Sequence, residues 1–320
     1  MSTPVPPSTV SPVDALGEAF DHTRRQLFPI RFERWLVLGL LAFLDQCGRS
    51  FHTGGGPGGH HGPLNVNVPP GLPEGPHGPG GLADWMLRAS AWLSAHAPLV
   101  VAVVLGSVLV MAVVAAIVLW FNSRGVFMYL DAVVSGRSDV GRPWRQHAAA
   151  ASSYYGWSLG LSLAMLFTVL FAVGAVAWSA LALASGRLHE TGGWLAAAAF
   201  SPILLLLLLA LPLLALARVA LRDFVAPLQL ATGLACGGAA RVLEGLVTQQ
   251  PGAFVLYLLL KLIVVIGTGI VIAVLGCLTC CLGFLPIVMQ VVFQPLFFFE
   301  RSFSVFLLRR MGYDVQSRLA

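Results

Sequence analysis

The clearest candidate for chemistry is Lys261, the only lysine of the chain, because it lies inside the apolar stretch Phe254–Leu275. A charge inside a bilayer costs roughly 2.5–3.5 kcal/mol on insertion scales, so such a residue is a functional candidate. Gln290, Gln294 and Glu300 follow in the next apolar stretch, and the spacing predicts that they form an intramembrane polar cluster with Lys261. The cluster is either a coupling or substrate site, or a snorkelling lysine bound to Gln294 or Glu300. Without a second intramembrane acid to relay protons, the pattern favours the structural interpretation.

A second candidate is the thiol group Cys277, Cys280 and Cys281, predicted at the outer turn between the last two apolar stretches. A CxxC spacing is typical of redox exchange or of half a metal site. No second cysteine pair and no activating cation accompanies it, so small cysteines that pack a tight turn are the favoured interpretation. A disulfide with Cys47 is the alternative in an oxidising compartment.

Histidines could supply metal ligands in the segment 48–82, where His52, His60, His61 and His77 are interspersed among glycines and prolines. Neutral imidazoles bind zinc, copper or nickel. Their spacing matches no compact site, and a Gly/Pro-rich stretch cannot bury an apolar core. We therefore expect a disordered extracytoplasmic loop, with weak metal capture as the alternative, and no cofactor.

Composition excludes a soluble enzyme. Hydrophobic residues make up 57% of the 320 residues and charged residues only 10%, whereas soluble proteins have about 25% charged residues. The sequence contains no P-loop, HExxH or GxSxG motif and no pair of intramembrane carboxylates, so we expect no enzymatic activity. The net charge of +5 comes from scattered basic residues, which argues against a nucleic-acid partner.

Apolar stretches near 20 residues match the thickness of a bilayer core, and they predict an all-α polytopic membrane protein. After a disordered tail at 1–12, residues 13–320 should form one helical membrane domain. Ser11, Pro12 and Asp14 predict a helix start, and Val13, Leu16, Phe20, Leu27 and Phe28 share one face of that helix. It lies either on the membrane surface or on the protein's own loops. The predicted spans are Phe28–Cys47, Leu99–Phe121, Trp157–Ala184, Trp194–Leu216, Phe254–Leu275 and Cys277–Phe299.

The arginines predict the orientation of these spans. Fifteen of the 19 basic residues fall on one side, three on the other, and Lys261 within a span. Basic residues are retained in the cytoplasm, so both termini should be cytoplasmic, in a bacterial inner membrane. The two long connections on that side carry arginines and aromatic residues, and either contact lipid headgroups or a partner protein, or cap the bundle. The candidate contact residues are Arg137, Arg142, Arg145, Trp144 and Arg222.

Several short motifs carry a family resemblance. They are Arg31-Phe-Glu-Arg-Trp-Leu-Val-Leu-Gly-Leu-Leu-Ala-Phe-Leu44, Asn122-Ser-Arg-Gly-Val-Phe127, Pro143-Trp144, Arg222-Asp-Phe-Val-Ala-Pro227 and Cys280-Cys-Leu-Gly-Phe-Leu-Pro286. With these, the chain resembles an uncharacterised family of bacterial multi-span membrane proteins. It is more loosely similar to the membrane domain attached to some glycerophosphodiester phosphodiesterases, without their catalytic domain. The resemblance implies a fold and a location, and it implies no activity or site residue.

Two hypotheses for function follow from the sequence. In the first, the chain is a non-enzymatic membrane protein, a scaffold whose cytoplasmic face engages membrane lipids or a partner protein. In the second, it is a small transporter or permease-like protein that uses the polar face around Lys261. A water-accessible cavity at Lys261 would favour transport, and a dry, closed bundle would favour the scaffold.

Overall fold

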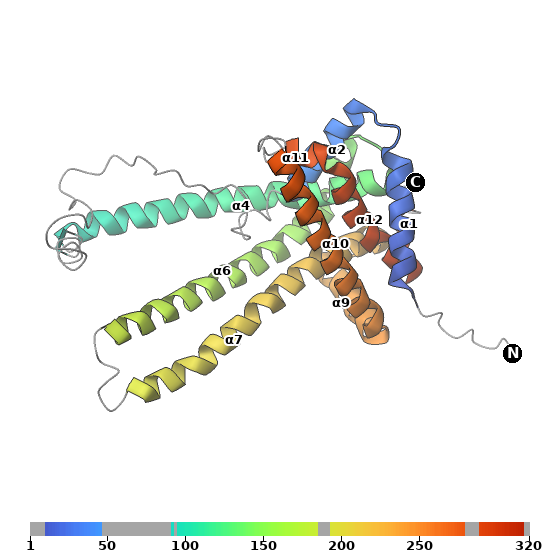
Figure 1. Ribbon diagram of the computed structural model, residues 1–320. Helices are drawn as coiled ribbons and strands as arrows, with labels where there is room; N and C mark the ends of the chain where they lie inside the picture. Colours follow the sequence, from blue (N-terminus) through green and yellow to red (C-terminus); the bar gives the residue numbers. More distant parts are fainter. Residues whose placement is uncertain (1–9, 47–90, 93–94, 185–192, 279–287, 317–320) are drawn as a thin grey trace. The chain divides into compact units, whose positions relative to one another are not determined.

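The computed structural model describes residues 10–46, 91–92, 95–184, 193–278 and 288–316, with the side chains of 178–204, 206 and 208 left out. Every regular element in these ranges is a helix (Figure 1), which confirms the predicted all-α class. The chain divides into two compact units, residues 1–52 with 119–320 and residues 53–118. The expected tail and the Gly/Pro/His-rich loop at 48–82 lie almost entirely outside the described residues.

Helix α1, Pro12–Leu27, starts as its sequence predicts. The Ser11 side chain accepts a hydrogen bond from the Asp14 N–H, and Pro12 occupies the first turn. The helix lies along α12, Gln294–Arg310 (Figure 1). Its packed face is made of small residues such as Ala15 and Ala19, whereas Val13, Phe20 and Phe28 of the predicted apolar face are exposed. The helix therefore packs on the protein itself and still presents apolar side chains outward.

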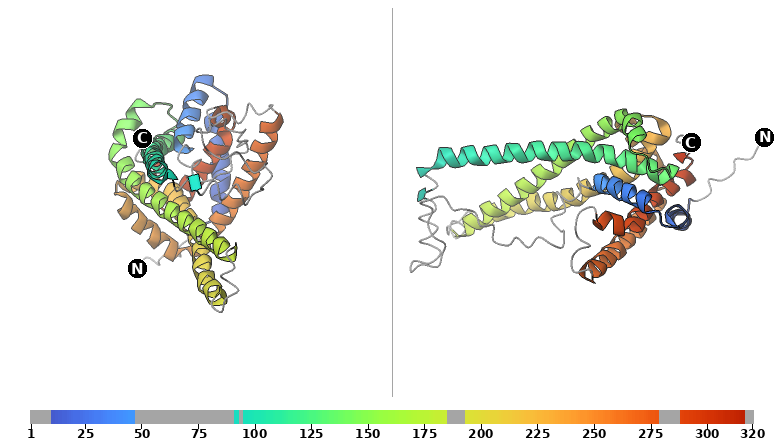
Figure 2. Two further views of the ribbon diagram at one scale, coloured as in Figure 1. Left: turned by 90° about the vertical axis from the view of Figure 1, so that its left-hand side faces the viewer. Right: turned by 90° about the horizontal axis from the view of Figure 1, so that it is seen from above.

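Three described helices are long and apolar enough to cross a membrane. They lie within α4, Ala97–Ser135, within α6, Ala148–Ala184, and within α10, Pro251–Leu278. The predicted span Trp194–Leu216 falls within α7, Gly193–Ala220, which runs beside α6 (Figure 2). In α4 the side chains from Leu99 to Ile117 are largely exposed, and continuous burial begins only near Asn122. An apolar helix with an exposed apolar surface is suited to lipid.

The first predicted span is wrong. Helix α2, Phe32–Gln46, covers most of this predicted span, and Cys47 lies outside the described residues. The Asn122 side-chain amide donates to the carbonyls of Leu44 at 3.0 Å and of Asp45 at 2.6 Å. A spanning α2 would place Asp45 at the outer face and Asn122 at the inner face, so these contacts rule that arrangement out.

The sixth predicted span, Cys277–Phe299, does not form one helix either. The chain is helical at α11, Val288–Val292, breaks, and continues as α12 to Arg310, well beyond the expected end. The break has a local cause, since Pro295 has no N–H to donate to the carbonyl of Val291 and its ring crowds that carbonyl. Residues 279–287 lie outside the described part of the chain.

Shorter helices complete the first unit. They are α5, Gly141–Gln146, the π-helical turn η1, Leu221–Val225, α8, Ala226–Thr232, and α9, Cys236–Gln249. Gly233 ends α8 with a φ of 74°, a conformation that glycine adopts without steric cost. Apolar side chains of η1, α8 and α9 join those of α1, α4, α6, α10 and α12 in one core that includes Phe127, Leu228 and Leu307. This core surrounds the charged residues described next.

Candidate functional site

A π-helical turn between α7 and α8 brings two adjacent charged residues, Arg222 and Asp223, into the interior. In this turn the N–H of Ala226 bonds to the carbonyl of Leu221, five residues back. Pro227 follows directly and cannot donate the helical bond to the carbonyl of Asp223, which favours a widened turn at this point. Such turns are frequent at functional sites, so the surroundings of these two side chains are the first place to look for one.

Arg222 joins carboxylates from two other helices. Its guanidinium pairs with Asp45, the penultimate residue of α2, and with Glu300 of α12 at 3.4 Å. Burial works against the charged guanidinium, but Asp45, Glu300 and Asp223 outweigh it and raise the pKa of Arg222. Arg222 is therefore a fixed positive charge that ties α2 and α12 to the π-helical turn.

Asp223 accepts from a second set of groups. Lys261 of α10 donates to its carboxylate and also lies 3.2 Å from Glu300. The Tyr257 hydroxyl donates to Asp223 at 3.1 Å, and an Arg301 guanidinium nitrogen lies 3.8 Å from the same carboxylate. Arg301 further donates to the backbone carbonyl of Arg222 at 2.6 Å. Lysine, arginine and tyrosine thus converge on one carboxylate.

Together these residues form an ion network, defined as Asp45, Arg222, Asp223, Lys261, Glu300 and Arg301. Its three acidic and three basic side chains sum to zero charge, and none of the six is more than 11% exposed. An unpaired charge at this depth would be very costly, and pairing with additional hydrogen bonds offsets that cost. The network can hold four helical segments in register, and the carboxylates of Asp223 and Glu300 are in contact with Lys261.

The predicted polar cluster is only partly reproduced by this geometry. Lys261 and Glu300 are in contact, in agreement with the structural interpretation of a lysine bound to Glu300. The Gln294 amide instead donates to the Tyr129 hydroxyl at 3.1 Å. Gln290 lies buried in α11. Within the described part of the chain, the side-chain oxygens of both glutamines lack a hydrogen-bond partner, so neither accepts from Lys261.

The predicted contact residues of the cytoplasmic connections separate into two groups. Arg222 lies inside the protein, where Asp45 and Glu300 compensate its charge. The prediction that it contacts lipid headgroups is therefore wrong. Arg137, Arg142 and Arg145 are exposed, on α5 and the segment before it. Trp144 is half-buried against Arg124, whose guanidinium lies 5.5 Å from the centroids of both the Trp144 and the Trp120 rings.

The remaining candidates stay predictions. Cys277 is exposed and not in a disulfide, whereas Cys280 and Cys281 lie outside the described residues. His52, His60, His61 and His77 lie outside them as well. Within the described ranges, no group of three His, Cys, Asp or Glu side chains could hold a metal ion.

Sequence reasoning missed Asp45, Asp223 and Arg301 as members of the network. Asp45 and Arg222 are separated by 177 residues, and no periodicity links positions so far apart. A signal was nevertheless present, since the chain has only 14 acidic residues and Asp45 ends an apolar stretch. An acid in such surroundings requires a partner, and the same rule that selected Lys261 would have selected Asp45.

Comparison with known proteins identifies the family of the chain but does not indicate an activity. Searches of the curated proteins and of the solved structures found no match. A family model described as a family of unknown function (DUF7544) matches residues 10–311, so the chain belongs to this family, which confirms the expectation of an uncharacterised one.

Proposed function

We propose that the chain is a non-enzymatic integral protein of the bacterial cytoplasmic membrane that binds anionic lipid headgroups or a partner protein at its cytoplasmic face. The observation that carries this proposal is the exposed basic segment with Arg137, Arg142 and Arg145, next to aromatic side chains at the end of an apolar helix. We name it the basic segment, residues 136–146.

Its surroundings support contact with headgroups. The exposed apolar surface of α4 ends at Trp120 and Phe121, both still partly exposed. Their rings pack against Trp144, with centroids 5.8 and 6.4 Å away. Tryptophan prefers the headgroup depth of a bilayer, and arginine binds phosphate. The three arginines of the basic segment would then lie at the phosphate layer.

The orientation belongs to the same proposal. We propose α4, α6, α7 and α10 as spans, with the arginine-bearing connections 136–147 and 221–250 in the cytoplasm. Helices α1 and α12 pack on each other and on η1 or α10, which start at those connections. For both termini to be cytoplasmic as well, the chain must cross the membrane twice more, once between α2 and α4 and once between α10 and α12. The looser likeness to phosphodiesterase membrane domains is compatible with this location and adds no activity.

The ion network supports a scaffold role. Its charges cancel and its side chains are buried, which is the arrangement expected of an ion network that fixes the relative positions of helices. Such a network would hold the compact helical region, including the basic segment, in one conformation. That shape is what a docking surface for a membrane or partner requires.

The test is the triple variant Arg137→Gln, Arg142→Gln, Arg145→Gln, with the charge-preserving Arg137→Lys, Arg142→Lys, Arg145→Lys as its control. Native mass spectrometry of the purified protein would count retained phosphatidylglycerol and any co-purified subunit. The glutamine variant should lose several-fold of the retained lipid or partner, and the lysine variant should keep most of it. Unchanged retention in the glutamine variant would contradict the proposal.

One observation favours transport as a second candidate. Lys261 touches Asp223 and lies 3.2 Å from Glu300, so acidic groups that could relay a proton do meet the buried lysine. The double variant Asp223→Asn, Lys261→Met removes this path and keeps the network neutral. If it folds normally and a deletion strain carrying it behaves as wild type in every uptake assay, the transport hypothesis is excluded. Loss of uptake with an intact fold would favour transport over the scaffold.

A further inference from the structure

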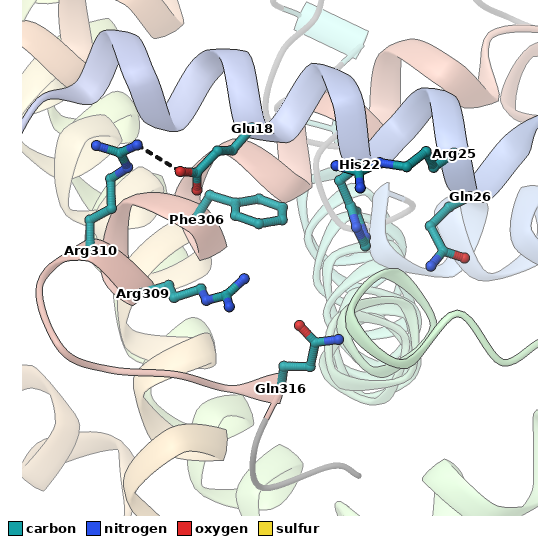
Figure 3. A pocket seen from close by; sticks show the side chains of 8 residues that line it. All are labelled: Glu18, His22, Arg25, Gln26, Phe306, Arg309, Arg310 and Gln316. Carbon is teal, nitrogen blue, oxygen red and sulfur yellow. Dashed lines mark hydrogen bonds and ion pairs between the residues drawn. The ribbon is translucent and has the colours of Figure 1, made fainter.

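A second charged region lies at the other end of α12. A cavity of about 650 Å³ opens between α1 and the last turn of α12, and Gln316 of the following segment closes one side. Figure 3 shows His22 and Gln26 of α1 across from Arg309 and Gln316. This volume falls within the range of about 300–1,000 Å³ typical of small-molecule sites.

The spacing of residues on α1 makes one wall of the cavity. Glu18, His22 and Gln26 recur every four residues and Arg25 lies three residues after His22, so they share one side of the helix. The opposite wall comes from α12, whose last turn ends in Arg309 and Arg310. Arg34 donates to the Gln26 side-chain oxygen at 2.7 Å, which leaves the amide nitrogen of Gln26 as a free donor.

The charges that line the cavity are not balanced. Arg310 is neutralised by Asp14 at 3.0 Å and Glu18 at 2.6 Å. Arg25 and Arg309 have no ion-pair partner within the part of the chain that the structure describes. The side-chain Nε of Arg25 donates only to the backbone carbonyl of Asp21. Asp314 lines a smaller adjoining hollow together with Arg309. The lining of the cavity itself therefore has an excess of positive charge.

The surroundings of His22 in the cavity wall include this positive charge. Its Nε2 lies 2.8 Å from the carbonyl of Val133, so the neutral ring donates there. Burial lowers the pKa of His22, and the positive charges of Arg25, Arg34 and Arg309 lower it further. The ring lies against Phe298 and Phe306 and is part of the cavity wall. The positive charges of Arg25, Arg34 and Arg309, which contribute to this shift after burial, favour an anion in the same place.

We propose that this cavity binds a phosphate monoester, carried either by a lipid headgroup or by a soluble metabolite. A phosphate monoester has a charge of about −1.5 to −2 at pH 7, which the two unpaired guanidinium groups match. Guanidinium groups bind phosphate oxygens through paired N–H donors, and the Gln26 and Gln316 amides add neutral donors. The site lies apart from the basic segment and goes beyond the function proposed above.

The test uses the full chain in nanodiscs of neutral phosphatidylcholine. Isothermal titration with glycerol 3-phosphate and with inorganic phosphate covers the soluble source. Native mass spectrometry from micelles with equal amounts of phosphatidic acid and phosphatidylglycerol covers the lipid source. Phosphatidylglycerol carries a phosphate diester, so it reports charge attraction without a monoester. The variants are Arg25→Gln and Arg309→Gln, with Arg24→Gln as the matched control, because Arg24 is exposed on α1 and does not line the cavity.

We expect Arg25→Gln and Arg309→Gln each to weaken monoester binding at least tenfold, Arg25→Lys to recover part of it, and Arg24→Gln to change it less than twofold. Binding of the soluble probes identifies a metabolite, and preferential retention of phosphatidic acid alone identifies a lipid. Either result supports the site. Absence of any monoester preference, or an equal loss in Arg24→Gln, would overturn it. Neither result depends on Arg137, Arg142 and Arg145, so this site and the proposed function can fail separately.

Discussion

Helix α12 carries arginines in two contrasting settings about two turns apart. Arg301 is fully buried, donates to the carbonyl of Arg222 and lies near Asp223. Arg309 is exposed and lines a cavity with excess positive charge. The same residue type thus serves a closed, neutral network at one point and an open, basic cavity at the other. The difference shows that function should be sought where charge is left uncompensated.

The energetic cost of removing a charged side chain also differs between the ion network and the cavity. In the ion network the charged side chains are almost entirely buried, so each charge depends on its partners and the removal of one is severe. At the cavity the arginines keep their hydration, so their removal costs the fold little and changes only what can bind. Stability measurements and binding measurements should therefore separate the two regions, and the following variants test that separation.

The largest effect should come from Asp223→Asn. This change removes the carboxylate that Lys261 and Arg301 share, and breaking a buried ion pair by removing one partner costs roughly 3–5 kcal/mol. Thermal unfolding in one detergent should show a large drop in Tm. The double variant Asp223→Asn, Lys261→Met restores neutrality and should recover part of the loss. A Tm equal to wild type in Asp223→Asn would mean that the network does not stabilise the fold.

The next effect on stability should come from Gly125→Ala, which disturbs the ion network indirectly through the end of α2. A Cβ at position 125 would lie 2.6 Å from the backbone carbon of Leu44, so the end of α2 must move and take Asp45 away from Arg222. Overpacking of this kind costs roughly 1–3 kcal/mol. The control is Gly160→Ala in α6, where the added carbon meets nothing within 4 Å. Equal unfolding temperatures for the two variants would contradict the close contact.

Tyr257→Phe makes a more local change, with an effect of similar size to that of Gly125→Ala. It removes the hydroxyl that donates to Asp223 at 3.1 Å, and a hydrogen bond to a charged group contributes about 1.5–3 kcal/mol. The ring keeps its packing against Phe224 and Phe303. Tyr313→Phe, on the segment after α12, serves as the control and should leave Tm unchanged. If both variants behave alike, Tyr257 acts through packing alone.

The smallest effect should follow Arg310→Gln. Its ion pairs with Asp14 and Glu18 are partly exposed, and such pairs contribute about 0–1 kcal/mol. Salt screens them, so the small loss at low ionic strength should disappear near 0.5 M salt. A loss as large as that of Asp223→Asn would remove the distinction between the two settings of α12.

The features that could be predicted from the sequence are those that depend on residues close together along the chain. Ser11, Pro12 and Asp14 fixed the start of α1, and the long apolar runs identified α4, α6 and α10. The single lysine pointed to the right neighbourhood because a lone charge in an apolar run is conspicuous. Hydropathy failed for α2 and for the last apolar stretch. There the contacts of Asn122 with the end of α2 and the break at Pro295 outweigh apolar composition.

The rest of the site depended on tertiary contacts. Asp45 and Arg222 meet across 177 residues, and the direction of both Arg222 and Asp223 depends on a π-helical turn that composition does not reveal. The basic cavity likewise needs α1 and the end of α12 side by side. Residue spacing on α1 alone predicted an apolar face, and gave no indication of the polar face opposite Arg309.

The order of the network along the chain has a consequence for biosynthesis. Asp45 is made first, and the adjacent pair Arg222 and Asp223 leaves its negative charge uncancelled. Lys261 is the residue whose synthesis first makes the set neutral, and the adjacent pair Glu300 and Arg301 then adds contacts without changing the balance. A nascent chain that has passed Lys261 can thus bury its charges before α12 emerges from the ribosome. The lone lysine is therefore the residue at which the network first becomes neutral during synthesis.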